Sequence, residues 1–389
     1  MSIDEAKVTT LLADLVRVES ITPWLIPGGS GERPVAEAMA AWLADLPVEV
    51  TFDEIEPGRV NTMVRLRGSG GGPTFCVNAH ADTVGCANWA DRALDPVIED
   101  GRMIGLGAAD DKSGCAAGLL AVRELVENGT KLRGDLLLAL VADEEGVSIG
   151  TEHLVERHTA DAALVIEPSG LPRLIVEHQG FGWIDVIVHG RAAHGSAPDQ
   201  GIDSIVHMAE VIQRLDRLDR EVFRANPDPR NGLTVFHTGT IQGGTDYATY
   251  PSKTVLGIEI GTQPGEHLSN RVAEIEAIFK ECAEILPGFR GEVDVKLDRE
   301  PFRASGHEQL QAALDAAAVS VIGRPFEPDG LNAWTDAALM QGAGIPTLQI
   351  GSAGGNFHAP DEWASIEELT QMARIVTEAT RTFCGVDGG

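Results

Sequence analysis

Short β-branched or leucine-rich runs that alternate with helical patterns constrain this chain more than any other feature. Such runs occupy residues 74–77, 136–141 and 163–166, and a helical pattern at 116–126 separates the first from the second. Strands that are apolar on both faces and are separated by helices are typical of a parallel sheet with helices on both sides. The sequence therefore predicts an α/β fold with a mostly parallel sheet.

The pattern changes after residue 180. The elements expected there are, in order, a strand near 181–188, a helix at 202–218, strands at 233–241 and 253–260, a helix at 266–285 and a strand at 291–297. This order is that of a ferredoxin-like α+β domain. Because strand and helix patterns resume at 309–382, we expect residues 181–297 to be inserted in a larger domain of residues 1–180 and 298–389.

Composition and charge exclude several classes of protein. The chain has 59 Asp and Glu against 30 Lys and Arg, a net charge of −29, which argues against a nucleic-acid or anionic-membrane partner. No apolar run approaches the roughly 18 residues that cross a bilayer, and residues 1–7 are acidic rather than signal-like. The five cysteines show no regular spacing, as expected of reduced thiols. We expect a soluble cytoplasmic protein.

Three of the apolar runs lead into acidic or imidazole side chains. His80 follows the first run, Asp143, Glu144 and Glu145 follow the second, and Glu167 follows the third. In open parallel sheets ligands bind at the carboxyl ends of the strands. We therefore expect these side chains to gather at one edge of the sheet.

A glycine-rich segment, Gly105–Gly114, lies between the first two runs and opens a helix. It allows a dinucleotide-binding loop, and hence an NAD-dependent dehydrogenase as the alternative from a different class. Asp110, however, stands where that motif needs a glycine or alanine, and its carboxylate would repel a phosphate. The loop suits a cation better.

A second imidazole, His358, lies in the glycine-rich segment 354–362 after an expected strand at 346–350. Zinc binds histidine nitrogen and carboxylate oxygen, and two ions about 3.5–4 Å apart need a bridging carboxylate and further ligands on each. The candidate metal ligands are His80, Asp110, Glu145, Glu167 and His358.

With these residues in place, the chain resembles the di-zinc hydrolases that include aminoacylases, acetylornithine deacetylase, succinyl-diaminopimelate desuccinylase and carboxypeptidase G. The motifs that carry the resemblance are Val77–Val84, Gly105–Lys112, Asp143–Glu145, Val165–Ser169 and Ala192–Pro198. They occur in the family's order and span essentially the whole chain. The resemblance implies a domain with two zinc ions, for which cobalt is a possible substitute, and an inserted lid and dimerisation domain.

The resemblance also assigns the ligands to the two ions. His80 and Glu167 would be end ligands of one zinc, and Glu145 and His358 of the other. Asp110 would bridge both ions.

Three further residues receive catalytic roles by the same resemblance. Asp82 would hold the His80 ring by a hydrogen bond, and Glu144 would be the general acid and base. His194, from the inserted domain, would stabilise the oxyanion in the other subunit of a homodimer.

The implied activity is hydrolysis of the amide bond of a small N-acylated amino acid or amine by a zinc-activated water. A metallo-dipeptidase or carboxypeptidase with the same site is the alternative. A catalytically silent metal-binding protein would be expected to have lost the base or a ligand, and here Glu144 and all the ligand candidates are present.

Substrate selection is less well defined by the sequence. Residues 334–337 match a family segment near the substrate, and backbone N–H groups of 351–355 are candidates for binding a carboxylate.

Two positions depart from the family pattern. Ala248 stands where many members have asparagine, and Gly261 stands where they have an arginine that grips the substrate carboxylate. Either another cation replaces that arginine, or the substrate is not a plain N-acyl-α-amino acid. The candidate replacements are Arg271, Arg303 and Arg324.

Overall fold

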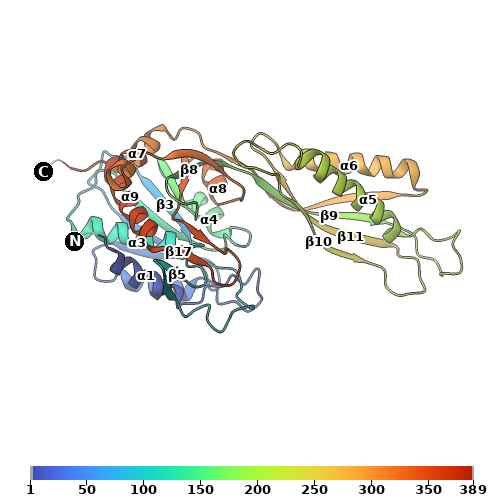
Figure 1. Ribbon diagram of the computed structural model, residues 1–389, viewed down its shortest axis with the longest axis horizontal. Coiled ribbons are helices and arrows are strands. Elements are labelled where there is room, and N and C mark those ends of the chain that lie inside the picture. The colour runs from blue at the N-terminus through green and yellow to red at the C-terminus, as the bar shows by residue number, and fades with distance from the viewer. Residues whose placement is uncertain (1–2, 388–389) are drawn as a thin grey trace. The chain divides into compact units, whose positions relative to one another are not determined.

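The computed structural model describes residues 3–387, and its largest sheet is built around the apolar runs of the sequence (Figure 1). Met1, Ser2, Gly388 and Gly389, at the ends of the larger expected domain, lie outside the described residues. One unit comprises Met1–Val176, Ala304–Asp329 and Thr335–Gly389. The second comprises Glu177–Arg303 and Gly330–Trp334, where the sequence analysis placed the insertion at 181–297.

The large sheet has nine strands in the order β1-β2-β6-β3-β7-β15-β8-β13, with β14 paired to β8. The strands are β1 (Glu49–Glu56), β2 (Arg59–Leu66), β3 (Phe75–His80), β6 (Leu136–Val141), β7 (Ala162–Ile166), β8 (Arg173–His178), β13 (Phe302–Arg303), β14 (Glu327–Leu331) and β15 (Thr347–Ile350). The central strands β6, β3, β7 and β15 are parallel, as the sequence predicts. Antiparallel pairs flank them on both sides, so the sheet as a whole is mixed.

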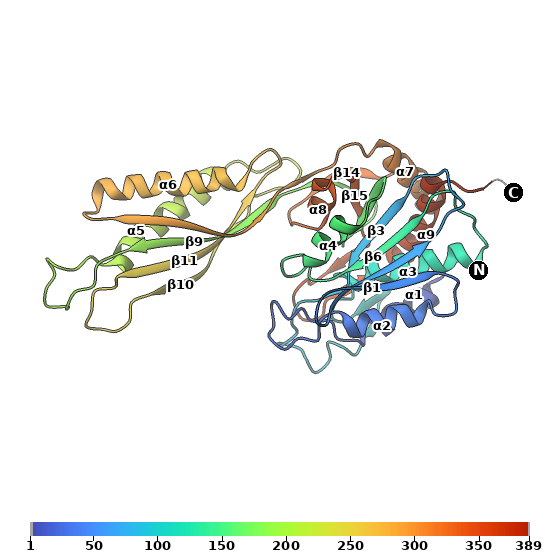
Figure 2. The ribbon, with the colours of Figure 1, turned by 180° about the vertical axis from the view of Figure 1, so that it is seen from behind.

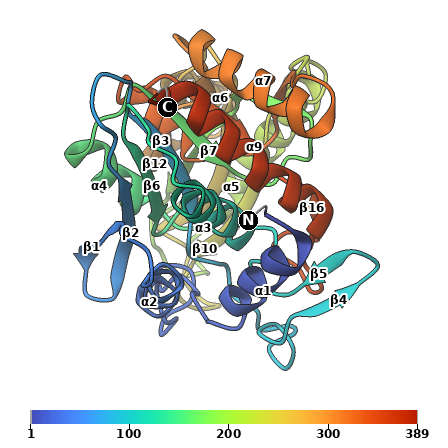
Figure 3. The same ribbon diagram turned by 90° about the vertical axis from the view of Figure 1, so that its left-hand side faces the viewer.

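Helices cover both faces of this sheet (Figure 3). The helices of the first unit are α1 (Glu5–Val16), α2 (Arg33–Trp42), α3 (Lys112–Glu127), α4 (Ile149–Arg157), α7 (Glu308–Ile322), α8 (Ala337–Gly342) and α9 (Ile366–Cys384). Helices α1, α3 and α9 pack on one another and α3 and α9 contact β3, whereas α4 and α8 pack together and contact β6 and β15 respectively. The buried apolar core joins the central strands to α1, α3 and α9.

Helix α3 begins earlier than its apolar pattern indicates. The sequence predicts residues 116–126, whereas the helix starts at Lys112 because the Asp111 carboxylate accepts a hydrogen bond from the Gly114 N–H (2.9 Å). Asp110 therefore lies directly before the capped first turn.

A small sheet in the same unit supports the loop that contains His358. Its strands, in the order β16-β17-β5-β4, are β4 (Val97–Glu99), β5 (Arg102–Ile104), β16 (Gly354–Gly355) and β17 (Trp363–Ser365). Strands β16 and β17 form the antiparallel hairpin that includes residues 356–362, hereafter the His358 hairpin.

The second unit has the ferredoxin-like order of elements that the sequence predicts (Figure 2). These are β9 (Gly180–His189), α5 (Ser204–Leu218), a π-helical turn (Asp219–Phe223), β10 (Phe236–Gly243), β11 (Lys253–Thr262), α6 (Leu268–Ile285) and β12 (Arg290–Arg299). The antiparallel sheet order is β10-β11-β9-β12, and both helices pack against it. Helix α5 begins two residues later than expected because Asp203 caps it, accepting from the N–H groups of Ile205 and Val206.

None of the helices in residues 3–387 is long and apolar enough to cross a membrane. The five cysteines are free thiols.

Candidate metal centre

The candidate residues gather at the carboxyl ends of parallel strands. His80 is the last residue of β3 and lies beside Val141, the last residue of β6. Glu167 follows β7, and its N–H donates to the carbonyl of Ile350 at the end of β15 (3.0 Å). Because these four strands are parallel neighbours, the polar residues at their ends share one edge.

His80 faces two carboxylates. Its Nε2 lies 2.9 Å from Oδ1 of Asp110 and 3.7 Å from Oε1 of Glu167. Ligand atoms of His80, Asp110 and Glu145 lie within 4.8 Å of one another, and so do those of His80, Glu144 and Glu167. Both groups are close enough to surround a metal ion.

His358 approaches Asp110 from the His358 hairpin. Its Nε2 lies 3.0 Å from Oε2 of Glu145 and 3.5 Å from Oδ2 of Asp110. Asp110 thus directs one oxygen towards His80 and the other towards His358. The second oxygen of Glu145 is buried and has no hydrogen-bond partner among the residues that the structure describes.

Asp82 connects His80 to the turn after β6. The His80 Nδ1 lies 3.1 Å from the Asp82 carbonyl and 3.5 Å from its carboxylate. The carboxylate accepts hydrogen bonds from the N–H groups of Glu144 and Glu145 (3.1 and 3.2 Å). If Nδ1 donates to the carbonyl, the lone pair of Nε2 points at Asp110 and Glu167, as a metal ligand requires.

The charges of the cluster fit a cation. Burial raises the pKa of Glu167 well above its ordinary value, and neighbouring carboxylates add to this. Burial also raises the pKa of Glu145. For His358, hydrogen bonds to Asp110 and Glu145 raise the pKa to about 10. In the protein alone a proton on His358 therefore offsets the carboxylates, and a bound metal ion would take over that role while releasing protons.

Glu144 lies in the same buried cluster. Burial raises its pKa well above the ordinary value, and the carboxylates of Asp336 and Glu145 act in the same direction. A raised pKa suits a carboxyl group that takes up and returns a proton near neutral pH.

Comparisons with known proteins match this chain over most of its length. The sequence model of peptidase family M20/M25/M40 matches residues 76–382. The chain belongs to this family.

Two curated relatives and one solved structure show the extent of the similarity. Succinyl-diaminopimelate desuccinylase of Alkalilimnicola ehrlichii is 29% identical over 87% of this chain and 91% of its own. The N-formyl-4-amino-5-aminomethyl-2-methylpyrimidine deformylase of Bacillus subtilis is 26% identical over 90% of this chain and 89% of its own. A Staphylococcus aureus tripeptidase superposes with a TM-score of 0.82 at 22% identity, covering 99% of this chain and 100% of that one.

These comparisons confirm three predictions made from the sequence. The family resemblance is confirmed, and so is the α/β fold. The expectation of an enzyme that hydrolyses C–N amide bonds is confirmed as well.

In this M20 chain the glycine-rich loop is not a free phosphate site. The carboxylate of Glu362 accepts hydrogen bonds from the N–H groups of Gly107, Ala109 and Asp110 (3.1, 2.9 and 3.0 Å). A dinucleotide phosphate would need such N–H groups. Their occupation by a carboxylate of the same chain argues against the dehydrogenase alternative.

The sequence analysis gave no role to Glu362, nor to a buried ion network around Arg59. The Arg59 guanidinium contacts the carboxylates of Glu32 (2.9 Å) and Asp143 (2.6 Å). Asp143 directly precedes Glu144 in the sequence. Neither feature forms a motif, because the partners of Glu362 are backbone groups and those of Arg59 are distant in the sequence. The only available signal was the presence of Glu362 within the segment 354–362.

The position expected to hold a substrate-binding arginine is crowded by the side chain of Gln179. Gly261 is buried in β11, and a side chain there would meet the amide oxygen of Gln179 at 2.7 Å from its first carbon. Among the candidate replacements, Arg271 is buried and bonded to Glu266 and Glu274. Arg271 therefore has no side-chain surface to offer a substrate carboxylate.

The other two candidate cations are exposed. Arg303 pairs with Glu177 (3.1 Å) and Arg324 lies 3.8 Å from Glu327, with side-chain exposures of 61% and 60%. Such exposed pairs are weak and exchange readily.

His194 belongs to the second unit and is exposed on the turn after β9. Its Nδ1 accepts a hydrogen bond from the Ser196 N–H (3.2 Å) and lies 2.8 Å from the Ser196 hydroxyl. An accepting Nδ1 leaves the proton of the neutral ring on Nε2, which is then a hydrogen-bond donor.

The segments expected near the substrate have different surroundings. Trp334 lies in the second unit against Phe181 and His178. Asp336 is buried in the first unit and accepts a hydrogen bond from the Thr151 hydroxyl (2.6 Å). Within 351–355, the N–H of Ala353 donates to the carboxylate of Glu368 (2.8 Å).

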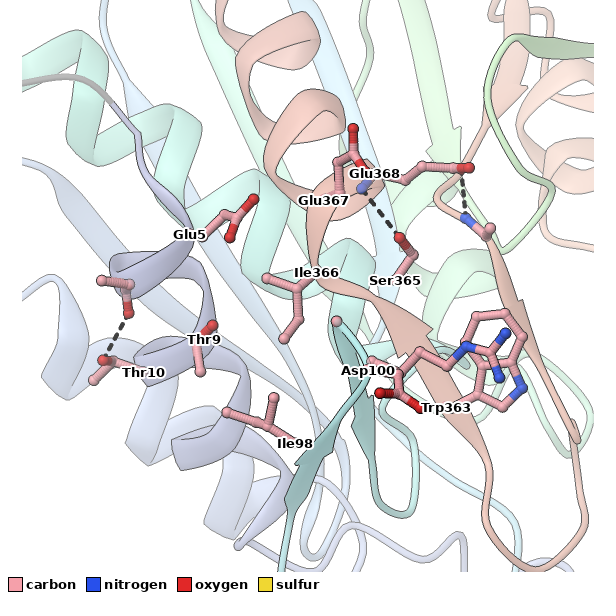
Figure 4. A pocket seen from close by; sticks show the side chains of 14 residues that line it. Glu5, Thr9, Thr10, Ile98, Asp100, Trp363, Ser365, Ile366, Glu367 and Glu368 are labelled. Carbon is pink, nitrogen blue, oxygen red and sulfur yellow. Dashed lines mark hydrogen bonds between the residues drawn. The ribbon is translucent and has the colours of Figure 1, made fainter.

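A pocket of about 990 Å³ lies at the base of the His358 hairpin (Figure 4). Residues of α1, β4, β5, β17 and the start of α9 line it, among them Glu5, Ile98, Trp363 and Glu367. None of the candidate metal ligands lines this pocket, so it is separate from the cluster.

Proposed function

We propose that this M20 chain is a metal-dependent amidohydrolase that cleaves the amide bond of a small N-acylated amine or amino acid. His80 and Glu167 would hold one ion, Glu145 and His358 the other, and Asp110 would lie between them. The observation that carries the proposal is the position of Asp110, whose two oxygens face His80 Nε2 at 2.9 Å and His358 Nε2 at 3.5 Å. A bridging carboxylate between two metal ions needs such a geometry.

Zinc or cobalt bound there would acidify a water molecule and polarise the substrate carbonyl. Glu144 would accept the proton of that water on a carboxylate oxygen and then donate it to the leaving amide nitrogen. Proton transfer of this kind contributes about 10²–10⁴ to the rate. Asp82 would orient the ring of His80 and fix the backbone of the turn that carries Glu144.

The substrate we propose does not depend on an arginine at position 261. A side chain at position 261 would have to displace the Gln179 amide, and Arg271 is bonded within its own unit. The two curated relatives are named for removing formyl and succinyl groups from amines. An acyl group on a small amine is therefore the first substrate class to test. A dipeptide, which has the same kind of bond, is the second.

The second unit would act as lid and dimerisation domain, with His194 donating from Nε2 to the oxyanion in the partner subunit. Two observations support this role. His194 is exposed, and its Nδ1 accepts a hydrogen bond from the Ser196 N–H. The net charge of −29 supports a small-molecule substrate rather than nucleic acid or an anionic membrane. A cytoplasmic location stays a prediction, in keeping with the five free thiols.

The test combines a metal count with turnover. The purified protein should hold about two zinc or cobalt ions per chain. Chelation should abolish hydrolysis of at least one member of a panel of N-formyl, N-acetyl and N-succinyl amines, amino acids and dipeptides, and zinc or cobalt should restore it.

Glu144 can be distinguished from a metal ligand by the same measurements. Glu144→Gln should retain both ions and lose about 10²–10⁴ in kcat. The matched variant Glu167→Gln should instead lose metal. Full turnover in a metal-free preparation, or loss of metal in Glu144→Gln, would contradict the proposed roles.

A further inference from the structure

The carboxyl group of Glu362 is buried and accepts hydrogen bonds from backbone N–H groups, and burial raises its pKa to about 7. The residue is 2% exposed. Its Oε1 accepts from the N–H groups of Ala109 and Asp110, and its Oε2 accepts from that of Gly107. Its carbonyl also accepts from the Gly105 N–H (2.9 Å). Glu362 therefore binds the whole turn that leads to Asp110.

Three N–H groups of the turn depend on this carboxyl group for their hydrogen bonds. Gly107 has a φ of +71°, and the following N–H groups converge on one point instead of forming a sheet or helix. Converging backbone N–H groups form a concave site for an anion. If the carboxylate were removed, buried N–H groups would lose their partners, at a cost of about 1–3 kcal/mol each. The hairpin that carries Glu362 and His358 would then lose its attachment to the turn.

Glu362 itself belongs to the His358 hairpin, so its hydrogen bonds connect this hairpin to the turn. The base of the hairpin is fixed: the guanidinium of Arg102 lies over the Trp363 ring, 4.1 Å from its centroid, and the Ala353 N–H donates to the Glu368 carboxylate. Figure 4 shows Trp363 and Glu368 at this base. The His358 side chain is 54% exposed, and its Nε2 faces Asp110 and Glu145. Its distance from Asp110 is therefore set by how firmly the hairpin is attached to the turn.

The remaining ligand candidates are positioned differently. His80 belongs to β3 and Glu167 follows β7, so the large sheet fixes both. His358 lies on a loop, and the contact nearest to it that reaches the Asp110 backbone is that of Glu362. The large sheet therefore positions His80 and Glu167, whereas the position of His358 depends on the hairpin.

We infer that Glu362 is a positioning residue that joins the Asp110 turn to the His358 hairpin, so that Asp110, Glu145 and His358 face the same metal ion. The inference rests on the proposed function. It predicts a selective defect: loss of the Glu362 carboxylate weakens the ion on the His358 side and leaves the ion on the His80 and Glu167 side in place.

The experiment is a titration of metal-free protein with cobalt, followed by calorimetry and by visible absorption. Glu362→Gln keeps the size of the side chain but places an NH₂ group against an N–H donor. We expect one cobalt equivalent to bind as in the wild type and the second about 10–100-fold more weakly. His358→Asn should reproduce this pattern, because it removes the ligand directly.

Glu368→Gln is the matched control. Glu368 also accepts from backbone N–H groups, those of Ala353 and Leu171, but it does not contact the Asp110 turn. Both glutamine variants should melt at a lower temperature, but only Glu362→Gln should lose affinity for the second equivalent. Glu362→Asp, which retains the charge with a shorter reach, should give an intermediate affinity and provides the comparison if Glu362→Gln does not fold.

The outcomes separate this inference from the proposed function. A wild-type protein that binds fewer than two cobalt ions contradicts the proposed function itself. A wild type with two ions and a Glu362→Gln variant that binds both equally well, or loses both equally, overturns the positioning role.

Discussion

Asp336 shows how burial sets the charge of a single residue next to the candidate site. Its side chain is 1% exposed, and burial raises its pKa from 3.8 to about 6, although the Thr151 hydroxyl donates to it. A carboxyl group whose pKa is raised by folding favours the folded state when it is protonated. Its contribution is therefore fully present below pH 3.8 and is lost as the pH rises through about 6.

Replacing Asp336 with asparagine removes this pH dependence while keeping an acceptor for Thr151. Relative to the wild type, Asp336→Asn should gain stability between pH 4 and 7, by up to about 3 kcal/mol for a shift of about two pKa units. Urea unfolding of both proteins across this range measures the difference. If the difference in unfolding free energy were constant across the range, or fell with pH, burial would not raise the pKa of Asp336.

Single residues also show where sequence reasoning succeeds. His80 and Glu167 could be predicted because each lies at the end of an apolar strand, and the position of strand ends follows from the pattern. Glu362 could not, because its partners are N–H groups whose convergence exists only after the turn at Gly107 has folded. Contacts with the backbone of a turn that is distant in the sequence carry no sequence signal.

At the scale of elements, the ion pairs of Arg59 with Glu32 and Asp143, hereafter the Arg59 network, stabilise the turn after β6. Asp143, at a φ of +67°, accepts from the N–H of Val147 and pairs with Arg59 from β2. Arg59 also pairs with Glu32, directly before α2, and both carboxylates are fully buried. One guanidinium thus joins a helix, a strand and the turn that presents Glu144.

Breaking this network should be costly. Arg59→Met keeps a long side chain but leaves two buried carboxylates without a cation, so the free energy of unfolding should fall by about 3–5 kcal/mol. The control is Arg33→Met, which removes a more exposed pair with Glu54 and should cost less than about 1 kcal/mol. Urea unfolding at neutral pH provides both values. Equal losses would mean that the buried network contributes no more than a surface pair.

The elements differ in how far the sequence determines them. Strands β3, β6 and β7 were predicted because continuous apolar residues can hardly be anything but buried. Strands β16 and β17 were not, because they have two and three residues and form only where a partner strand is already in place. Strand β1 was missed as well, since much of it is exposed and it contains four acidic residues.

At the scale of the whole molecule, one edge of the second unit's sheet is exposed. Within residues 3–387, strand β10 lies at that edge and pairs only with β11, and seven of its eight residues are exposed. An exposed edge strand readily pairs with another chain. Ile241 of β10 is 56% exposed, and Ile205 and Val206 at the start of α5 are 45% and 59% exposed. These features favour the proposed homodimer, with β10 at its interface.

A charge on this edge tests the assembly. Ile241→Lys should give monomers in light scattering at concentrations where the wild type is a dimer, because a buried lysine at a paired edge is unfavourable. Ile285→Lys, at an equally exposed isoleucine (56%) at the end of α6, should leave the dimer intact. If His194 acts in the partner subunit, Ile241→Lys should also lose turnover while it still binds metal. A dimeric Ile241→Lys would exclude β10 from the interface, and a fully active monomer would place the catalytic donor within one chain.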